Sequence, residues 1–266
     1  MTALSRRAKL GVVLGLGAAA SLVAAALPPI PQDPAYHRLA DGRTLLGIPN
    51  ALNVLSNVLF VTAGLAGLRA LGAGAFVEAR ERWPYAVFFV GLILTGFGSA
   101  YYHLEPGNAR LVWDRLPLAV TVMGLFAAVI AERVAVPVGL RLLAPLVALG
   151  IVSVLQWQMT ETRGAGDLRL YGLVQFFPML AVPLLLAWFP PRYTRGGDLL
   201  VAVAVYAGAK VFELGDRAIM DAGHLLSGHT LKHVLVSVTG YWIVRMLRAR
   251  APVDVPALAT RAEGRS

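Results

Sequence analysis

Eight long runs of apolar residues limit what this chain can fold into more than any other feature of the sequence. A helix needs about 20 mostly apolar residues to cross a bilayer, where its backbone polar groups must be hydrogen-bonded within the segment. The linkers collect the prolines, glycines and charges, as in "FPPRYTRGGD" (189–198). The candidate spans cover residues 9–27, 52–72, 84–103, 116–132, 139–157, 169–189, 198–215 and 229–247.

The composition supports a membrane protein. Of the 266 residues, 57% are hydrophobic and 15% charged, against about 45–50% apolar and 25% charged in soluble domains. The sequence contains no cysteine, which excludes disulfides, thiolate nucleophiles and cysteine metal ligands. We therefore predict an all-α, multi-pass transmembrane helix bundle. Residues 31–250 form a seven-span core, residues 1–30 an anchor or a secretory signal, and residues 251–266 a disordered cytoplasmic tail.

The basic residues predict the orientation. The net charge of +9 does not indicate a nucleic-acid partner, because most of the charges lie in short loops between apolar runs, where the positive-inside rule explains them. If all eight runs cross, fifteen Lys and Arg residues lie on the side of the termini and eight on the other side. Both termini are then cytoplasmic. Cleavage of the first run would leave seven spans and an outside N-terminus.

Polar residues gather at the predicted outer ends of three spans. Ser99 and His103 stand four apart at the end of one span, so they share a helix face. Asp114 is expected to open the next span, and His229 and His233 open the last one, again four apart. Ionisable groups in membrane helices are costly and are functional candidates by default.

Three imidazoles suit a catalytic zinc ion, which commonly takes three protein ligands and leaves a fourth position for water. His103, His229 and His233 are the candidate ligands. The metal would lower the pKa of its water toward about 7, Asp114 would orient that water or act as a general base, and Ser99 would hydrogen-bond a developing oxyanion. Taken singly, the histidines could be solvated, Asp114 could cap its helix, and Ser99 could ease helix packing. Their shared depth favours a joint site.

The segment before the last span adds further candidates. Lys210 and Glu213 stand three apart and could form an intramembrane pair that supports the site. We expect His224 to lie in the outer rim. Lys232 is expected to face away from the two histidines of its helix and to extend toward lipid headgroups.

These motifs resemble the alkaline ceramidase family, within a superfamily of seven-span metallohydrolases that includes adiponectin-receptor-like and GPI-anchor-remodelling proteins. The resemblance rests on "SAYYH", "WDR" and "GHTLKH" and extends over residues 40 to 248. It implies a zinc amidase whose three histidines bind zinc, with the Ser and Asp assisting the water and the tetrahedral intermediate. The substrate would be a membrane lipid with a long acyl chain, such as the sphingolipid ceramide, cut at the outer membrane boundary.

The resemblance also implies a calcium site in the segment before the second apolar run. Calcium prefers oxygen ligands, carboxylates above all. Here the candidates are Asp41, Asn50 and Asn53, and Asn50 stands where an acid is expected. The sequence therefore makes calcium doubtful.

Two other functions stay open at this point. One is a non-catalytic seven-span lipid receptor or sensor that keeps a structural zinc ion. The other is a haem-binding membrane protein, since histidines can ligate haem iron. The haem hypothesis is weaker, because His229 and His233 lie on one helix face and an Asp and a Ser join the cluster.

Overall fold

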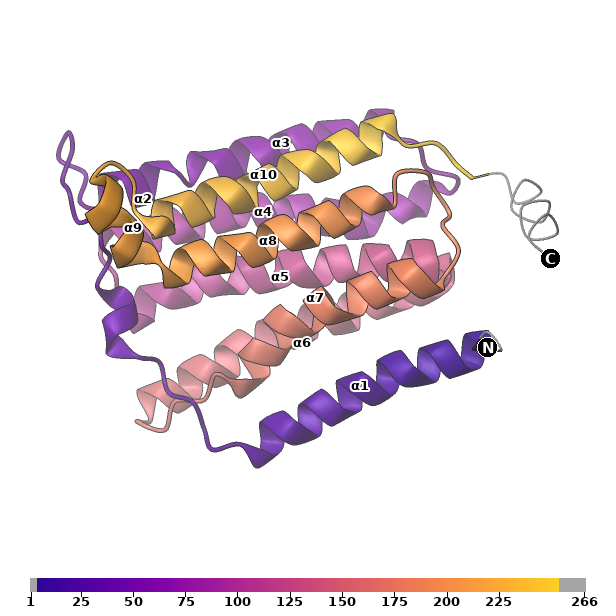
Figure 1. Cartoon of the computed structure of the whole chain (residues 1–266), viewed down its shortest axis with the longest axis horizontal. Helices are drawn as coiled ribbons and strands as arrows, with labels where there is room; N and C mark the ends of the chain where they lie inside the picture. Colours follow the sequence, from indigo (N-terminus) through magenta and orange to yellow (C-terminus); the bar gives the residue numbers. More distant parts are fainter. Residues whose placement is uncertain (1–3, 254–266) are drawn as a thin grey trace.

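The structure, a computed structural model, describes residues 4–253 and consists of helices joined by short loops (Figure 1). Over this part of the chain, strand pairing is limited to two isolated bridges, Leu45–Ile48 and Tyr193–Pro252. The predicted all-α bundle is confirmed. The helices are α1 (Arg6–Ala26), η1 (Pro34–His37), α2 (Ala51–Leu55), α3 (Val58–Ala73), η2 (Ala79–Glu81), α4 (Arg82–Leu104), α5 (Asn108–Arg133), α6 (Val136–Thr162), α7 (Arg169–Trp188), α8 (Gly197–Leu214), α9 (Asp216–Gly223) and α10 (Gly228–Ala249).

Six helical segments of the described chain are long and apolar enough to cross a membrane. They are α1, the α2–α3 pair, η2 with α4, α5, α6 and α7. The last two predicted spans, α8 and α10, lie in the same bundle and have 18 and 22 residues. They are less uniformly apolar, because α8 carries three charged residues and α10 carries two histidines and three basic residues.

Three boundaries differ from the sequence prediction. Helix α5 begins at Asn108, eight residues before the predicted span, so Asp114 lies within the helix rather than at its start. The predicted 52–72 span is interrupted at Ser56 and Asn57, between α2 and α3. Residues 216–223, predicted as loop, form the short helix α9. Apolar composition marks only the lipid-facing length of a helix, and polar turns continue beyond it.

Successive long helices run in opposite directions, so the first and last described residues lie at the same end of the bundle (Figure 1). The opposite end carries α2 and α9. Helix α4 packs between α3 and α5, and α10 packs against α3 and α8. Small residues allow this close approach. A Cβ placed on Gly67 of α3 would lie 2.0 Å from the ring of Phe89 in α4.

The two ends of the chain are attached to the bundle to different extents. Helix α1 lies along α7 at the edge, and Val13 is its buried residue (Figure 1). Residues 251–253 follow the segment 192–194: the Thr194 amide donates to the Ala251 carbonyl, and the Val253 amide donates to the Arg192 carbonyl. The rest of the predicted tail lies outside the described residues.

Candidate metal centre

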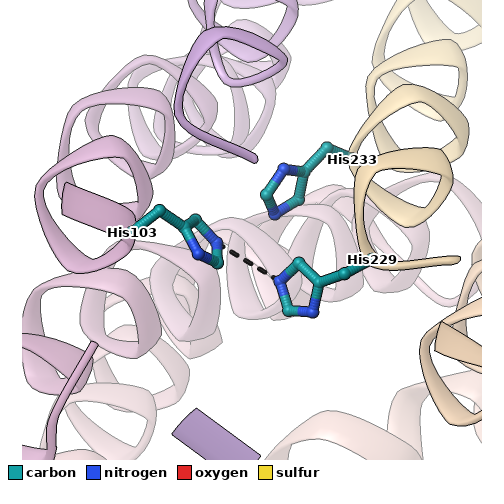
Figure 2. A group of neighbouring side chains, drawn as sticks. All are labelled: His103, His229 and His233. Carbon is teal, nitrogen blue, oxygen red and sulfur yellow. Dashed lines mark hydrogen bonds between the residues drawn. The ribbon is translucent and has the colours of Figure 1, made fainter. Parts of the chain in front are cut away.

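Three histidine side chains meet at the end of the bundle that carries α2 and α9 (Figure 2). His103 comes from the last turn of α4, and His229 and His233 come from the first turns of α10. Their ring centroids lie 4.7–4.9 Å apart, and all three residues are buried. One ring nitrogen of each lies within 4.8 Å of the others. This histidine group, which the sequence predicted, could hold a metal ion.

The geometry and chemistry of the histidine group fit a transition-metal ion such as zinc. The Nε2 atoms of His103 and His229 are 3.2 Å apart. Two nitrogens bound to one tetrahedral zinc at 2.0–2.1 Å are separated by about 3.3 Å. His233 Nε2 is buried without a hydrogen-bond partner, which is uncommon for buried polar atoms. A metal ion would satisfy such a nitrogen, and imidazole suits zinc, copper, iron and nickel.

Each histidine is held by a different part of the chain. Ser56, in the break between α2 and α3, has its Oγ 2.8 Å from His233 Nδ1. The Asn50 side-chain amide donates to the backbone carbonyl of His103 over 2.8 Å. Asp216, at the start of α9, accepts from the backbone amide of His229 over 2.8 Å. Such outer contacts fix the orientation of metal ligands.

A charged cluster borders the histidine group. Glu213 accepts from the ammonium groups of Lys210 and Lys232 over 2.9 Å each and from the Tyr36 hydroxyl over 3.0 Å. The predicted Lys210–Glu213 pair is therefore present. The prediction that Lys232 faces away is wrong, because its Nζ lies 2.9 Å from His229 Nε2. Residues three apart are neighbours on a helix surface, which the sequence interpretation overlooked.

Ser99 and Asp114 line the same small space as one member of the histidine group, His233. The cavity measures about 30 Å³ and lies between α3, α4, α5, α8 and α10, which is enough space for a water molecule. Gly107, not Asp114, is the N-cap of α5. The capping alternative for Asp114 is thereby excluded, and its carboxylate shares a cavity with a candidate metal ligand.

A second cavity adjoins the first in the interior of the bundle. It measures about 70 Å³ and lies between α4, α5, α7, α8 and α10, among mostly apolar side chains. Leu118, Tyr206 and Val236 line both cavities. The polar space beside the histidine group therefore adjoins apolar space among the helices.

The three calcium candidates do not form a calcium cage. Both carboxylate oxygens of Asp41 accept from the Arg43 guanidinium over 2.8 Å, and these hydrogen bonds lower the pKa of Asp41 from its ordinary value. The Asn50 side-chain amide donates to the backbone carbonyl of His103, and the Asn53 amide donates to the backbone carbonyl of Asp41 over 3.0 Å. A guanidinium thus occupies the position beside Asp41 where a cation would be bound, and these residues do not fit calcium.

The structure also assigns contacts that the sequence did not predict. Ser56 contacts the ring of His233, and Tyr36 bonds to Glu213. A serine inside the apolar run "ALNVLSNVLF" was the available signal for Ser56. The two other histidines lie outside the group: His37 is within hydrogen-bonding distance of Tyr102 and Asn108, and His224 is exposed, as predicted for the rim.

No model of a known protein family matches the chain, and no curated protein matches it either. The function of the chain is therefore inferred from its own residues.

Proposed function

We propose that the chain is a zinc-dependent membrane hydrolase that cleaves the amide bond of a ceramide-like N-acyl lipid. One observation carries the proposal. The histidine group lies beside a cavity lined by Ser99 and Asp114, and this cavity adjoins an apolar cavity inside the bundle. A metal ligand set, a carboxylate, a hydroxyl and an apolar space are the parts that hydrolysis of a lipid amide needs.

Different residues of the chain would bind the metal, transfer the proton and stabilise the developing charge. His103, His229 and His233 would hold the zinc ion, which supplies Lewis acidity and a water molecule whose pKa is lowered toward about 7. Asp114 accepts a proton from water and returns it to the amide nitrogen as the C–N bond breaks. Ser99 donates its hydroxyl hydrogen to the acyl oxygen as negative charge develops there. Water is added across the C–N bond, and a fatty acid and an amine are released.

The apolar cavity supports a lipid substrate. Its lining is contributed by five helices and is mostly apolar. An acyl chain that moves from the bilayer into this cavity would therefore stay in an apolar environment. Leu118, Tyr206 and Val236 mark where the chain would pass toward the acyl carbonyl. The walls do not specify the head of the lipid, so ceramide, another N-acyl lipid or an ester lipid are all substrates to test.

The sidedness of the site is part of the proposal. The end of the bundle with the first and last described residues carries the larger share of Lys and Arg, and by the positive-inside rule this end would be cytoplasmic. The histidine group comes from the last turn of α4 and the first turns of α10, which lie at the opposite end (Figure 1), and would lie near the extracytoplasmic face.

A lipid receptor with a structural zinc ion is the second candidate, since it would need the same ligands. The cavity that Ser99 and Asp114 share with His233 favours a hydrolase over it. The haem hypothesis is disfavoured because the imidazole rings of the histidine group contact one another. Axial ligands of a haem stand on opposite sides of the macrocycle, whereas the His103 and His229 Nε2 atoms are 3.2 Å apart.

Metal content and lipid hydrolysis of the purified chain test the proposal together. We expect one zinc ion per chain and release of fatty acid from a ceramide substrate in micelles. His103→Ala should lose both the metal and the activity. Asp114→Asn should keep the metal and lose activity by roughly 10²–10⁴-fold, the usual contribution of a general base.

His224→Asn is the matched control, because it removes an exposed histidine from a left-handed position that Asn tolerates. It should retain zinc and activity. Zinc bound with no hydrolysis of amide or ester lipids would support the receptor, and absence of any metal from the wild-type chain would contradict both.

A further inference from the structure

Two adjoining cavities lie at the other end of the bundle, where the first and last described residues are found. One, of about 230 Å³, is lined by Arg6 and Lys9 of α1, Arg133 and Val134 at the end of α5, and residues 188–190. The other, of about 510 Å³, extends from Arg133 along residues 186–191 to the start of α8. Arg133, Trp188, Phe189 and Pro190 line both cavities.

All charged residues that line these two cavities are basic. Arg6, Lys9, Arg133 and Arg195 line them, and neither lining includes an Asp or a Glu. Arg195 is paired with Asp198 over 2.6 Å. Within residues 4–253, the other three cations form no ion pair.

Arg6, Lys9 and Arg133 bond to backbone carbonyls instead. Arg6 donates to Val134, and Lys9 donates to Trp188 over 2.9 Å. Arg133 donates to the carbonyls of Leu186 and Phe189 over 3.4 and 3.2 Å. Carbonyl dipoles offset only part of the cost of three cations held together.

Arg133 is the central cation of the pair of cavities. It is 8% exposed, and a buried charge without a counter-charge is costly. The neighbouring carboxylate of Glu132 is engaged by Tyr85 and Arg250 and is not available to it. Arg133 Nη2 lies against Gly196, where an added Cβ would be 1.9 Å away. An anion in the cavities would supply the missing counter-charge.

The surroundings indicate that this anion is part of a lipid. Helix α1 packs loosely on α7 and leaves most of its apolar length exposed (Figure 1), so acyl chains can lie along it. Trp188 lines both cavities, and Trp is enriched at membrane–water interfaces. Basic pockets between membrane helices bind anionic headgroups on the cytoplasmic side, which is where the basic residues place this end.

We propose that these two cavities bind the phosphate headgroup of an anionic membrane phospholipid. Arg133 contacts the phosphate from the bundle, and Arg6 and Lys9 contact it from α1. The lipid thereby joins the peripheral helix to the core. The site is separate from the histidine group, and its test does not depend on hydrolysis.

Lipid binding to the intact chain tests this proposal. The purified protein would be titrated in micelles with phosphatidylglycerol, with phosphatidylcholine of the same acyl chains, and with inorganic phosphate. Binding would be followed by native mass spectrometry and by the melting temperature. We expect phosphatidylglycerol to bind more tightly than phosphatidylcholine and to raise the melting temperature.

Arg6→Gln combined with Lys9→Gln should weaken phosphatidylglycerol binding by roughly 25-fold, about five-fold for each cation removed. Arg7→Gln combined with Arg69→Gln is the matched control, since it removes two exposed charges that line neither cavity. The control should bind as the wild type does.

Three results would overturn the proposal: equal affinity for the two lipids, equal losses in the two double variants, or inorganic phosphate alone binding as tightly as the lipid. The last result would indicate a site for the free anion. All four substitutions are at exposed or half-buried positions, so the bundle should fold in each variant.

Discussion

Single side chains fix how the histidine group is presented. His233 is oriented by Ser56, and the backbones of His103 and His229 are held by Asn50 and Asp216. The three partners come from the segment before α2, the break after it, and α9. A ligand set held in this way loses little conformational freedom when a metal binds, which favours high affinity.

Replacing Ser56 with Ala should lower zinc affinity by roughly 10–100-fold, the usual effect of losing an outer partner of a ligand. The His233 ring would lose its contact at Nδ1 and could rotate. Competition with a metal-sensitive dye measures the affinity. Ser153→Ala is the control, because Ser153 is more deeply buried than the half-buried Ser56 but bonds to Gly150 within α6. Equal affinities in wild type and Ser56→Ala would show that the contact does not orient the ligand.

Among the helices, the contact of α4 with α5 places the catalytic candidates. Ser99 and His103 belong to α4, and Asp114 belongs to α5. Gly98 lies directly against α5, where an added Cβ would be 1.9 Å from the Trp113 carbonyl oxygen. The absence of a side chain at this position lets the two backbones approach closely enough for Asp114 and Ser99 to share one cavity.

Gly98→Ala should therefore destabilise the bundle by about 1–3 kcal/mol, the usual cost of overpacking. It should also lower the hydrolytic activity, because the added methyl group would move Asp114 away from Ser99. Thermal unfolding and lipid hydrolysis measure the two effects. In Gly208→Ala, at a helical position with no neighbour within 4 Å, the better helix propensity of Ala should leave stability unchanged or raised. If Gly98→Ala changed neither the melting temperature nor the activity, α4 and α5 could move apart at this position without loss of stability.

Across the whole bundle, the two ends differ in chemistry. One end holds the histidine group, the Glu213 cluster and the loop that contains the Asp41–Arg43 ion pair. The other end holds both described termini and the basic cavities around Arg133. Such polarity is expected of a protein that meets different solutions and different lipids at its two ends.

Because the chain has no cysteine, single cysteines can report the sidedness directly. Leu46 lies at the histidine end and is fully exposed, and Val77 lies at the other end and is 55% exposed. A membrane-impermeant maleimide should label Leu46→Cys in intact cells and Val77→Cys only after permeabilisation. The cysteine-free wild type is the control. The reverse pattern would place the histidine group in the cytoplasm.

The sequence alone predicted the fold class and the group of three histidines that could hold a metal ion. Long apolar runs force helices, since backbone groups in lipid must be bonded within the segment. The i, i+4 spacing of His229 and His233, and the depth shared with His103, were enough to predict that the three meet. These signals are local, or depend only on how far each residue lies along its helix.

The tertiary arrangement settled what those signals leave open. The rotation of each helix about its axis and the choice of its neighbours depend on side-chain packing at contacts such as Gly67–Phe89 and Gly98–Trp113. That packing turned Lys232 toward His229, brought Ser56 to His233 and placed the polar cavity next to the apolar one. It also set the Arg43 guanidinium on Asp41. Partners distant in sequence are determined by packing that no spacing along one helix encodes.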